Sequence, residues 1–222
     1  MKRKIIFILF LLAIVITTSC RQKADGIRNG DLVFVGLPAE YEAEASSIDA
    51  AISAATGIEN QVQITHVCIV EVAKDSLWII DATPNRGVSR RPLKTFLEES
   101  RRIDGSSPEY IVKRVKGINT DAAVVLAKSF CGRSYDFRFL PDNEEFYCSE
   151  LIQQCYLDAR GEPIFESQPM NFLAPDGSMP PFWEQLFRQL EMEVPQGIPG
   201  TNPQHLSESE FLTDIAVEFI PN

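Results

Sequence analysis

The stretch QVQITHVCIVEVAKDSLWIIDA, residues 61–82, decides the fold. Both of its ends are rich in β-branched and aromatic residues, whereas the four residues between them, 73–76, are small or polar. This composition favours two strands joined by a short turn. We therefore predict an antiparallel hairpin with strands over residues 61–72 and 77–82.

The segments around this hairpin predict further strands and helices. Apolar runs predict strands over residues 32–35, 87–90 and 110–115. Apolar residues at helical spacing predict helices over residues 40–56, 93–98, 119–130 and 182–190, and over FYCSELIQQCYLDA, residues 146–159, up to the stop signal Gly161. Helices before, between and after antiparallel strands indicate an α+β fold in which the sheet packs against helices.

The first 20 residues, MKRKIIFILFLLAIVITTSC, have the pattern of a secretory signal, with a basic start, an apolar run and small residues before Cys20. The apolar run is shorter than the roughly 20 residues of a membrane span. The ending resembles a bacterial lipoprotein cleavage site, so we expect a chain exported to the bacterial cell envelope and anchored to a membrane through lipidated Cys20. The alternative is an ordinary secretory signal cut nearby. Residues 21–29 would form a tether, and residues 30–222 one domain.

The charge of the chain excludes one class of partner. Removing the three basic residues of the leader leaves 18 basic residues against 31 acidic ones, a net charge of −13. Nucleic-acid binding depends on neutralising phosphates, so we expect no nucleic-acid partner. No motif calls for a cofactor.

Four cysteines remain besides Cys20, at positions 68, 131, 148 and 155. Two disulfides are conceivable in an exported protein, but Cys148 and Cys155 are too far apart along one helix to bridge each other. No pair has the CxxC spacing of a structural zinc site, so no metal is expected. Cys155 falls on the apolar face of its helix, as a small core residue would.

Cys148 lies at the start of a predicted helix, where the free N–H groups and the dipole favour a thiolate. It is either a nucleophile or a small buried residue. A nucleophilic thiol needs a base, and the sequence holds two histidines, His66 in a predicted strand and His205 after Asn202-Pro203. One strand histidine with one helix-start cysteine is the papain-like arrangement, which favours His66 over the alternative of a core histidine.

A catalytic histidine is usually oriented by a third group, and Asp81 is the first candidate. If the hairpin turns around residues 74–75, residues whose numbers sum to about 148 lie opposite each other, so Asp81 lies near Val67 and beside His66. Glu71 competes, but an odd separation along the strand places it on the opposite face from His66. The alternative for Asp81 is a turn former at a strand end.

Five segments in this order resemble the YiiX-type permuted papain-like hydrolases of the NlpC/P60 superfamily: 30–34 (GDLVF), 65–70 (THVCIV), 79–82 (IIDA), 132–136 (GRSYD) and 147–151 (YCSEL). Residues 201–206 (TNPQHL) are similar to a late element of these proteins. The resemblance spans residues 30–211. In that family, the histidine strand precedes the cysteine helix, the reverse of papain.

The resemblance implies Cys148 as nucleophile, His66 as base, and Asp81 where the family usually has Glu. Cys68 stands where the family often has Gly; it either packs, which we favour, or narrows the cleft, or forms a regulatory disulfide with Cys148. Tyr147 either lines the substrate cleft or is a packed aromatic residue, and Tyr135 and Asp136 would border the substrate groove.

These features predict an exported cysteine peptidase or amidase that cleaves an amide bond, with peptides or peptidoglycan fragments as substrates. Two alternatives stay open. One is a lipid-directed acyltransferase or phospholipase, favoured if Phe137, Phe139 and Phe172 line the cleft. The other is a surface lipoprotein that binds ligands on a catalytically inactive hydrolase fold.

Overall fold

A computed structural model describes residues 26–38, 41, 43–57, 61–74, 76–102, 104–141 and 143–217. The predicted signal peptide, the lipidation site Cys20 and residues 21–25 of the predicted tether lie outside this range. Among the helices of the described ranges, none is long and apolar enough to cross a membrane.

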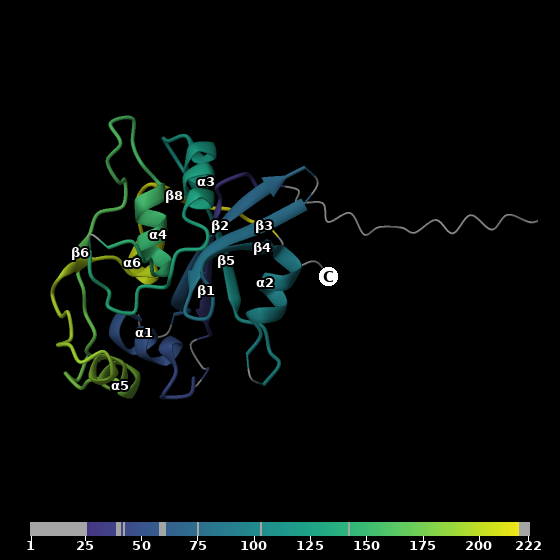
Figure 1. Cartoon of the computed structure of the whole chain (residues 1–222). Coiled ribbons are helices and arrows are strands. Elements are labelled where there is room, and N and C mark those ends of the chain that lie inside the picture. The colour runs from purple at the N-terminus through teal and green to yellow at the C-terminus, as the bar shows by residue number, and fades with distance from the viewer. Residues whose placement is uncertain are drawn as a thin grey trace, which may run out of the picture.

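A six-stranded antiparallel sheet in the order β4-β3-β2-β1-β5-β8 forms the centre of the structure (Figure 1). Its strands are β1 (Leu32–Leu37), β2 (Gln63–Ala73), β3 (Ser76–Thr83), β4 (Gly87–Pro92), β5 (Glu109–Val115) and β8 (Leu212–Asp214). The short edge strand β8 was not predicted from the sequence. The α+β fold with an antiparallel sheet packed against helices is confirmed.

The predicted hairpin is formed by β2 and β3. Ile69 lies opposite Ile80 and Val70 opposite Ile79, one residue away from the predicted register. The shift matters for the site. In the predicted register, Asp81 would lie opposite Val67 and so on the face away from His66, whereas the observed register extends to place it opposite Cys68, on the same face as His66.

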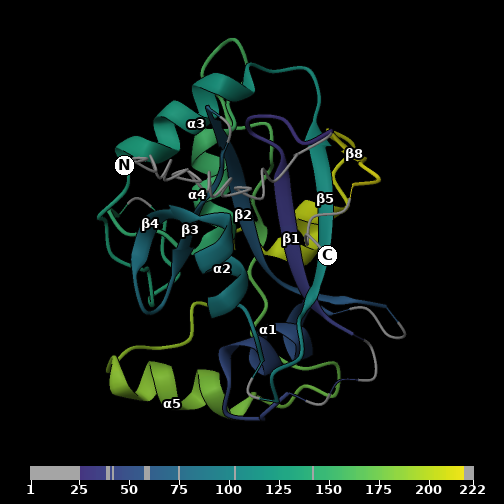
Figure 2. The same cartoon turned by 90° about the vertical axis from the view of Figure 1, so that its right-hand side faces the viewer.

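Helices cover both faces of the sheet (Figure 2). On one face, α2 (Leu93–Glu99) buries Leu93 and Phe96 against the odd-numbered residues of β1 and β3. On the other face lie α3 (Thr120–Ser129), α4 (Cys148–Cys155) and α6 (Pro203–Ser207). The remaining helices, α1 (Ile48–Thr56) and α5 (Pro181–Gln189), lie together beyond one end of the sheet, and a two-stranded ribbon pairs β6 (Gln168–Pro169) with β7 (Pro199–Gly200).

Two predicted helices are shorter than expected. The first was predicted over residues 40–56 but begins at Ile48, because the side chain of Ser47 accepts a hydrogen bond from the Ala50 N–H and caps it. The helix predicted over 146–159 ends at Cys155, and Gly161 lies in a separate turn. The buried Tyr156 leaves the helix there, and its hydroxyl donates to the carbonyl oxygen of Gly30 at 2.9 Å.

A β-bulge interrupts β2 one residue before His66. Val35 pairs with His66 but Gly36 pairs with Ile64, so Thr65 is the extra residue of the strand. Ile64 and Val67 therefore pack in the same core cluster although they are an odd number of residues apart. A bulge re-aims the side chains around it, and this one lies where His66 must reach from the sheet toward α4.

Candidate active site

Cys148 is the first residue of α4 and is buried. The helix begins there because Tyr147 has an extended backbone, and the carboxylate of Glu150 accepts a hydrogen bond from the Tyr147 N–H at 3.4 Å. The next N–H groups of the first turn face away from the helix without an intrahelical acceptor and carry the positive end of its dipole. The Cys148 side chain thus lies at the N-terminal end of α4, beside these N–H groups.

The loop that leads into α4 is organised by Asp136. Its buried carboxylate accepts hydrogen bonds from the N–H groups of Arg138 at 2.8 Å and Leu140 at 3.0 Å, and from the side chain of Asn143 at 3.1 Å. Predicted to border the substrate groove, Asp136 instead lies outside the linings of the two cavities described below. The contacts of Asp136 fix the conformation of the loop that precedes Cys148 in the chain.

His66 lies between Asp81 and Cys148. Its Nε2 atom is 2.8 Å from Oδ2 of Asp81, and Cys148 is close enough to raise the pKa of its imidazole; Nδ1 is the ring nitrogen that Asp81 leaves free. Asp81 is fully buried, whereas 20% of the His66 side chain is exposed. The structure therefore brings the three residues predicted from the sequence into one cluster, and the shorter side chain of Asp reaches the imidazole directly.

The charges of this cluster reinforce one another. Burial opposes the charged form of His66, but the hydrogen bonds to Asp81 and Cys148 and the charges of both raise its pKa to about 10. Burial also opposes the charged form of Asp81, and the hydrogen bond and charge of His66 together with Arg91 lower its pKa. At neutral pH, the imidazole is therefore protonated beside an ionised carboxylate.

Arg91 of β4 is the part of the site that the sequence analysis missed. Its Nη2 atom donates to Oδ2 of Asp81 at 2.9 Å, and its Nη1 atom donates to Oδ1. In the β3–β4 hairpin, Asp81 pairs with Ser89 and Ile79 with Arg91, so Arg91 lies one pleat from Asp81 on the same face. Counting outward from the turn at residues 84–86 would have found this pairing.

Glu71, the competing carboxylate, lies on the other face of the sheet as predicted. It pairs with Arg90 and accepts from Nζ of Lys128 on α3 at 2.9 Å. Burial opposes its charged form, but these two cations lower its pKa. The hydrogen-bond partners of Glu71 are therefore two cations, and His66 is not among them.

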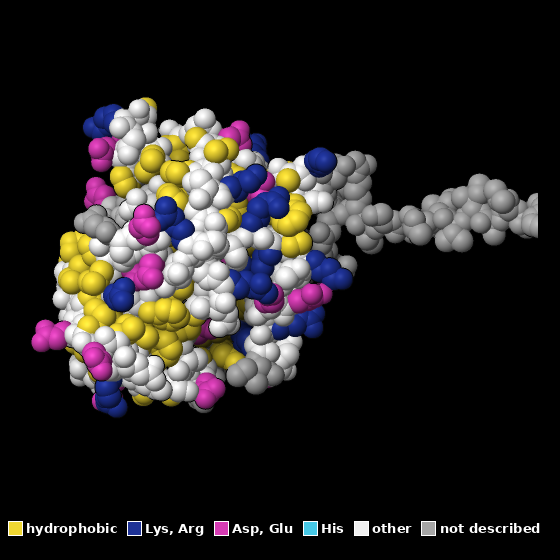
Figure 3. Space-filling view, viewed as in Figure 1, with side chains coloured by type: hydrophobic (Ala, Val, Ile, Leu, Met, Phe, Trp, Pro, Cys, Tyr) yellow, Lys and Arg dark blue, Asp and Glu magenta, His cyan; other side chains and the backbone are white. Residues whose placement is uncertain are grey.

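A large cleft of about 850 Å³ opens beside the cluster, and His66, Cys148 and Tyr135 line it. Its other walls carry side chains of both charges, among them Arg86, Arg101, Arg102, Glu44 and Asp49. Although the chain is acidic overall, Lys and Arg side chains gather over β3, β4 and α2 (Figure 3). The thiol and the imidazole are therefore on the wall of a cavity with room for a substrate.

A smaller, apolar cavity of about 40 Å³ adjoins Cys148 on its other side. Phe139, Phe172 and Trp183 line it, as do Tyr135 and Tyr147. The Tyr147 hydroxyl accepts a hydrogen bond from the Thr201 N–H at 3.0 Å. Tyr147 is therefore a packed aromatic residue, and it lines this small cavity rather than the large cleft.

The other cysteines and His205 do not line either of these two cavities. Cys68 is free, fully buried among the side chains packed under α2, and donates weakly to the carbonyl oxygen of Val33; burial raises its pKa well above the usual range. Burial likewise raises the pKa of Cys155, which packs in the core as expected. Cys131 and His205 are exposed.

The donor set does not fit a metal centre. Within the described ranges, no three His, Cys, Asp or Glu side chains gather in a way that could hold a metal ion.

A histidine strand followed by a cysteine helix, around an antiparallel sheet, is the arrangement of a permuted papain-like fold. A family model described as "Permuted papain-like amidase enzyme, YaeF/YiiX, C92 family" matches residues 26–216, and the chain belongs to this family. The uncharacterized protein YiiX of Escherichia coli strain K12 is 25% identical over 196 residues, which cover 86% of this chain and 87% of that protein. The resemblance to the YiiX-type hydrolases is confirmed.

A solved structure has the same fold. The crystal structure of the protein described as metalloprotein yiiX from Escherichia coli O157:H7 superposes with a TM-score of 0.64 at 24% sequence identity. The match covers 86% of this chain and 97% of that one. The fold therefore extends over nearly the whole length of that relative.

Proposed function

We propose that this protein is a cysteine amidase or peptidase in which Cys148 is the nucleophile, His66 the general acid and base, and Asp81 the group that orients His66. The observation that carries the proposal is that His66 contacts the buried Asp81 carboxylate and lines the same cleft as the Cys148 thiol. Membership of a papain-like amidase family agrees with this chemistry.

The reaction follows from these positions. The Cys148 thiolate attacks the carbonyl carbon of the substrate amide, and the electron pair of the carbonyl moves to its oxygen. The backbone N–H of Cys148, at the start of α4, is the group placed to donate to that oxygen. The tetrahedral intermediate collapses as protonated His66 gives its proton to the leaving amine, which leaves a thioester.

Water completes the cycle. Neutral His66 takes a proton from a water molecule as the water oxygen attacks the thioester carbonyl. The carbon–sulfur bond then breaks, the carboxylic acid leaves, and the thiolate of Cys148 and protonated His66 are restored. Asp81, which stays ionised, keeps Nε2 of the ring engaged and leaves Nδ1 to face the reacting atoms.

The substrate that suits the cleft best is a peptide. Its walls carry Arg101 and Arg102 as well as Glu44 and Asp49, so groups of either charge find a partner there. With export and anchoring through Cys20, which we also propose, the natural substrates would be peptides derived from the cell wall, such as peptidoglycan fragments.

A second candidate is an enzyme acting on lipid acyl groups. The apolar residues beside Cys148, among them Phe139, Phe172 and Trp183, favour it, although the cavity that they line holds only about 40 Å³ and would have to widen to take an acyl chain. The same nucleophile and base would then attack an ester or amide of a fatty acid.

One experiment separates these functions. Purified protein is incubated with muropeptides and, separately, with phospholipid vesicles, and the products are identified by mass spectrometry. We expect new amide-cleavage products with wild type and with Cys131→Ala, which removes an exposed cysteine elsewhere, and none with Cys148→Ala. Fatty-acid release that depends on Cys148 would favour the lipid enzyme instead.

A catalytically inactive binding protein would behave differently. Cys148 would then fail to react with iodoacetamide at neutral pH while the protein still bound peptide. Cleavage that survives Cys148→Ala would rule out the proposed nucleophile.

A further inference from the structure

We propose that Arg91 is a positioning residue of this site, which holds the Asp81 carboxylate ionised and fixed in the plane from which it orients His66. The inference rests on the proposed cysteine mechanism and deepens it, because it assigns a role to a residue outside the set of Cys148, His66 and Asp81. Arg91 acts on His66 through Asp81 rather than on the thiol itself, and it also lines the wall of the cleft.

The first support is the geometry at Asp81. Two nitrogens of Arg91 contact the two oxygens of Asp81, and Nη2 donates to the same Oδ2 that contacts Nε2 of His66. A two-point contact between planar groups fixes the rotation of the carboxylate, which a single contact would leave free. The direction in which Oδ2 faces the imidazole is therefore set by Arg91.

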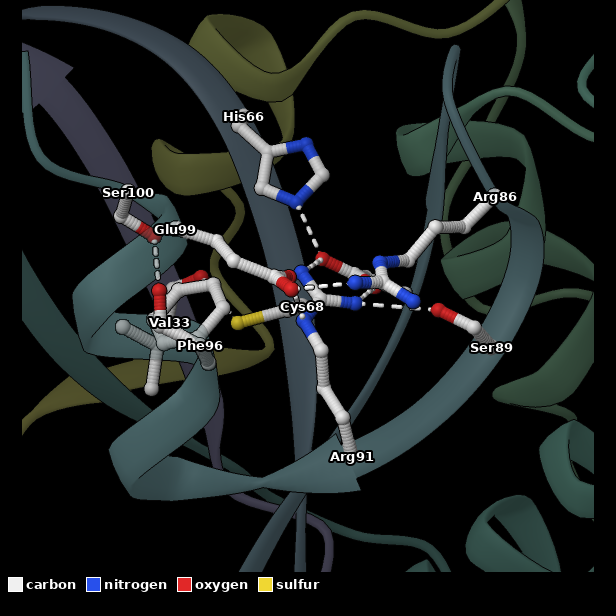
Figure 4. Close-up of polar contacts among 10 residues, drawn as sticks. Val33, His66, Cys68, Arg86, Ser89, Arg91, Phe96, Glu99 and Ser100 are labelled. Carbon is white, nitrogen blue, oxygen red and sulfur yellow. Dashed lines mark hydrogen bonds and ion pairs between the residues drawn. The ribbon is translucent and has the colours of Figure 1, made fainter.

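The second support is that Arg91 is itself held in place. Its Nη1 atom donates to the Ser89 hydroxyl at 3.0 Å, its Nε atom lies 3.1 Å from Oε2 of Glu99, and its guanidinium lies over the Phe96 ring, 5.4 Å from the ring centre. In Figure 4, the side chains of His66, Arg86, Arg91 and Glu99 converge from different sides. Because it has contacts on several sides, the guanidinium of Arg91 is restricted to one position.

The third support is the sequence of charges. From the thiol outward, the groups Cys148, His66, Asp81, Arg91, Glu99 and Arg86 form a chain of contacts in which positive and negative charges alternate. Asp81 is fully buried, so water cannot stabilise its charge. Its two cationic partners are His66 and Arg91, and Arg91 is the one that keeps its charge throughout the reaction.

Loss of Arg91 therefore has a defined direction. Without the guanidinium, the buried carboxylate binds a proton at higher pH than before. A neutral Asp81 no longer stabilises the imidazolium of His66, and the imidazolium no longer stabilises the thiolate of Cys148. The pH range over which the thiol is reactive should then begin at a higher pH.

The test measures the rate of Cys148 alkylation by iodoacetamide as a function of pH, with the alkylated peptide identified by mass spectrometry. In Arg91→Met, we expect the acid-side midpoint of the profile to rise by at least about one pH unit, which is about a tenfold slower reaction on the acid limb. Arg91→Lys keeps the charge but loses the two-point contact, and should fall between Arg91→Met and wild type.

The matched control is Arg90→Met. Arg90 is the neighbouring arginine of the same strand, pairs with the buried Glu71 on the other face, and lies over the Trp78 ring. Its loss removes an ion pair of the same kind without touching Asp81, so the profile should stay at the wild-type position even if the melting temperature falls.

The outcomes separate this inference from the proposed function. A wild-type Cys148 that does not react at neutral pH contradicts the proposed function. A reactive wild type with the same midpoint in Arg91→Met as in Arg90→Met contradicts the role of Arg91. If Arg91→Met does not fold, Arg91→Lys and Glu99→Gln, which loosens Arg91 from outside, decide the question: unchanged midpoints in both overturn the inference.

Discussion

Two buried carboxylates on neighbouring strands, Asp81 and Glu71, differ in their use rather than in their chemistry. Each is paired with an arginine of β4, Asp81 with Arg91 and Glu71 with Arg90, and each has a lowered pKa in spite of burial. The difference is the third partner, which is the imidazole of His66 for Asp81 and the ammonium group of Lys128 for Glu71.

The two-residue period of the strands creates this difference. Consecutive arginines on β4 point to opposite faces of the sheet, and each meets a carboxylate there. On one face, the carboxylate of Asp81 lies beside His66 at the cleft. On the other face, the carboxylate of Glu71 lies beside Lys128 of α3. A buried ion pair alone is therefore no sign of catalysis; its contact with a group that can transfer a proton is what distinguishes the two.

The largest expected effect separates the two carboxylates by reactivity. Asp81→Asn should slow iodoacetamide alkylation of Cys148 at pH 6 by about a hundredfold, because the neutral amide no longer stabilises the imidazolium. Glu71→Gln should leave this rate within about twofold of wild type. Equal effects of the two substitutions on the rate would break the comparison.

The next effect is on stability. Glu71→Gln should lower the free energy of unfolding by about 2 kcal/mol, between the values for exposed and buried ion pairs, because Glu71 is buried but its partners are partly exposed. Urea denaturation of the variant and of wild type at pH 7 measures it. A variant as stable as wild type would mean that the second ion pair contributes nothing to folding.

A smaller effect concerns alkaline pH. The pKa of His66 is about 10 in the folded protein against 6.5 for the free side chain, so the folded state binds the extra proton between these values. The stability from this proton is complete below pH 6.5 and is lost as the pH rises toward 10. Wild type should lose up to about 1.4 kcal/mol from pH 7 to pH 8, and His66→Gln clearly less, in denaturation curves at each pH.

The smallest effect is expected at acid pH. Because the pKa of Glu71 is lowered from its ordinary value of 4.5, its contribution is present above that value and is lost as the pH falls through the folded pKa. Between pH 5 and pH 3, wild type should lose less than about 1 kcal/mol more stability than Glu71→Gln. An identical acid profile for both proteins would contradict the assigned ion pairs.

The sequence contained the catalytic cluster in outline. Hairpin pairing predicted Asp81 near His66, and the two side chains do meet, but the predicted register faced Asp81 away from His66; the observed shift of one residue brings both to the same face. The cysteine at a helix start was also recognisable, since Cys148 is the first residue of α4. These features are local and follow from periodicity.

What escaped prediction depends on contacts between distant segments. The bulge at Thr65 has no signal in the strand's own composition, and Arg91 lies one residue beyond the predicted strand 87–90, whereas β4 extends to Pro92. The smaller extent of α4 depends on Tyr156 finding the carbonyl of Gly30 across the core. Side-chain partners of this kind become visible only when the strands are placed side by side.

The way β4 is fastened to the rest of the molecule has a consequence for engineering. At Gly87, the backbone has a φ of +62°, and an added Cβ would lie 2.1 Å from the carbonyl oxygen of Arg133, which also accepts the N–H of Val88. The segment that leads to α4 and Cys148 is thus hydrogen-bonded to β4, the strand that carries Arg91. Insertions aimed at changing substrate preference should be placed in surface turns away from Gly87. A side chain at position 87 would displace both β4 and the segment that leads to Cys148.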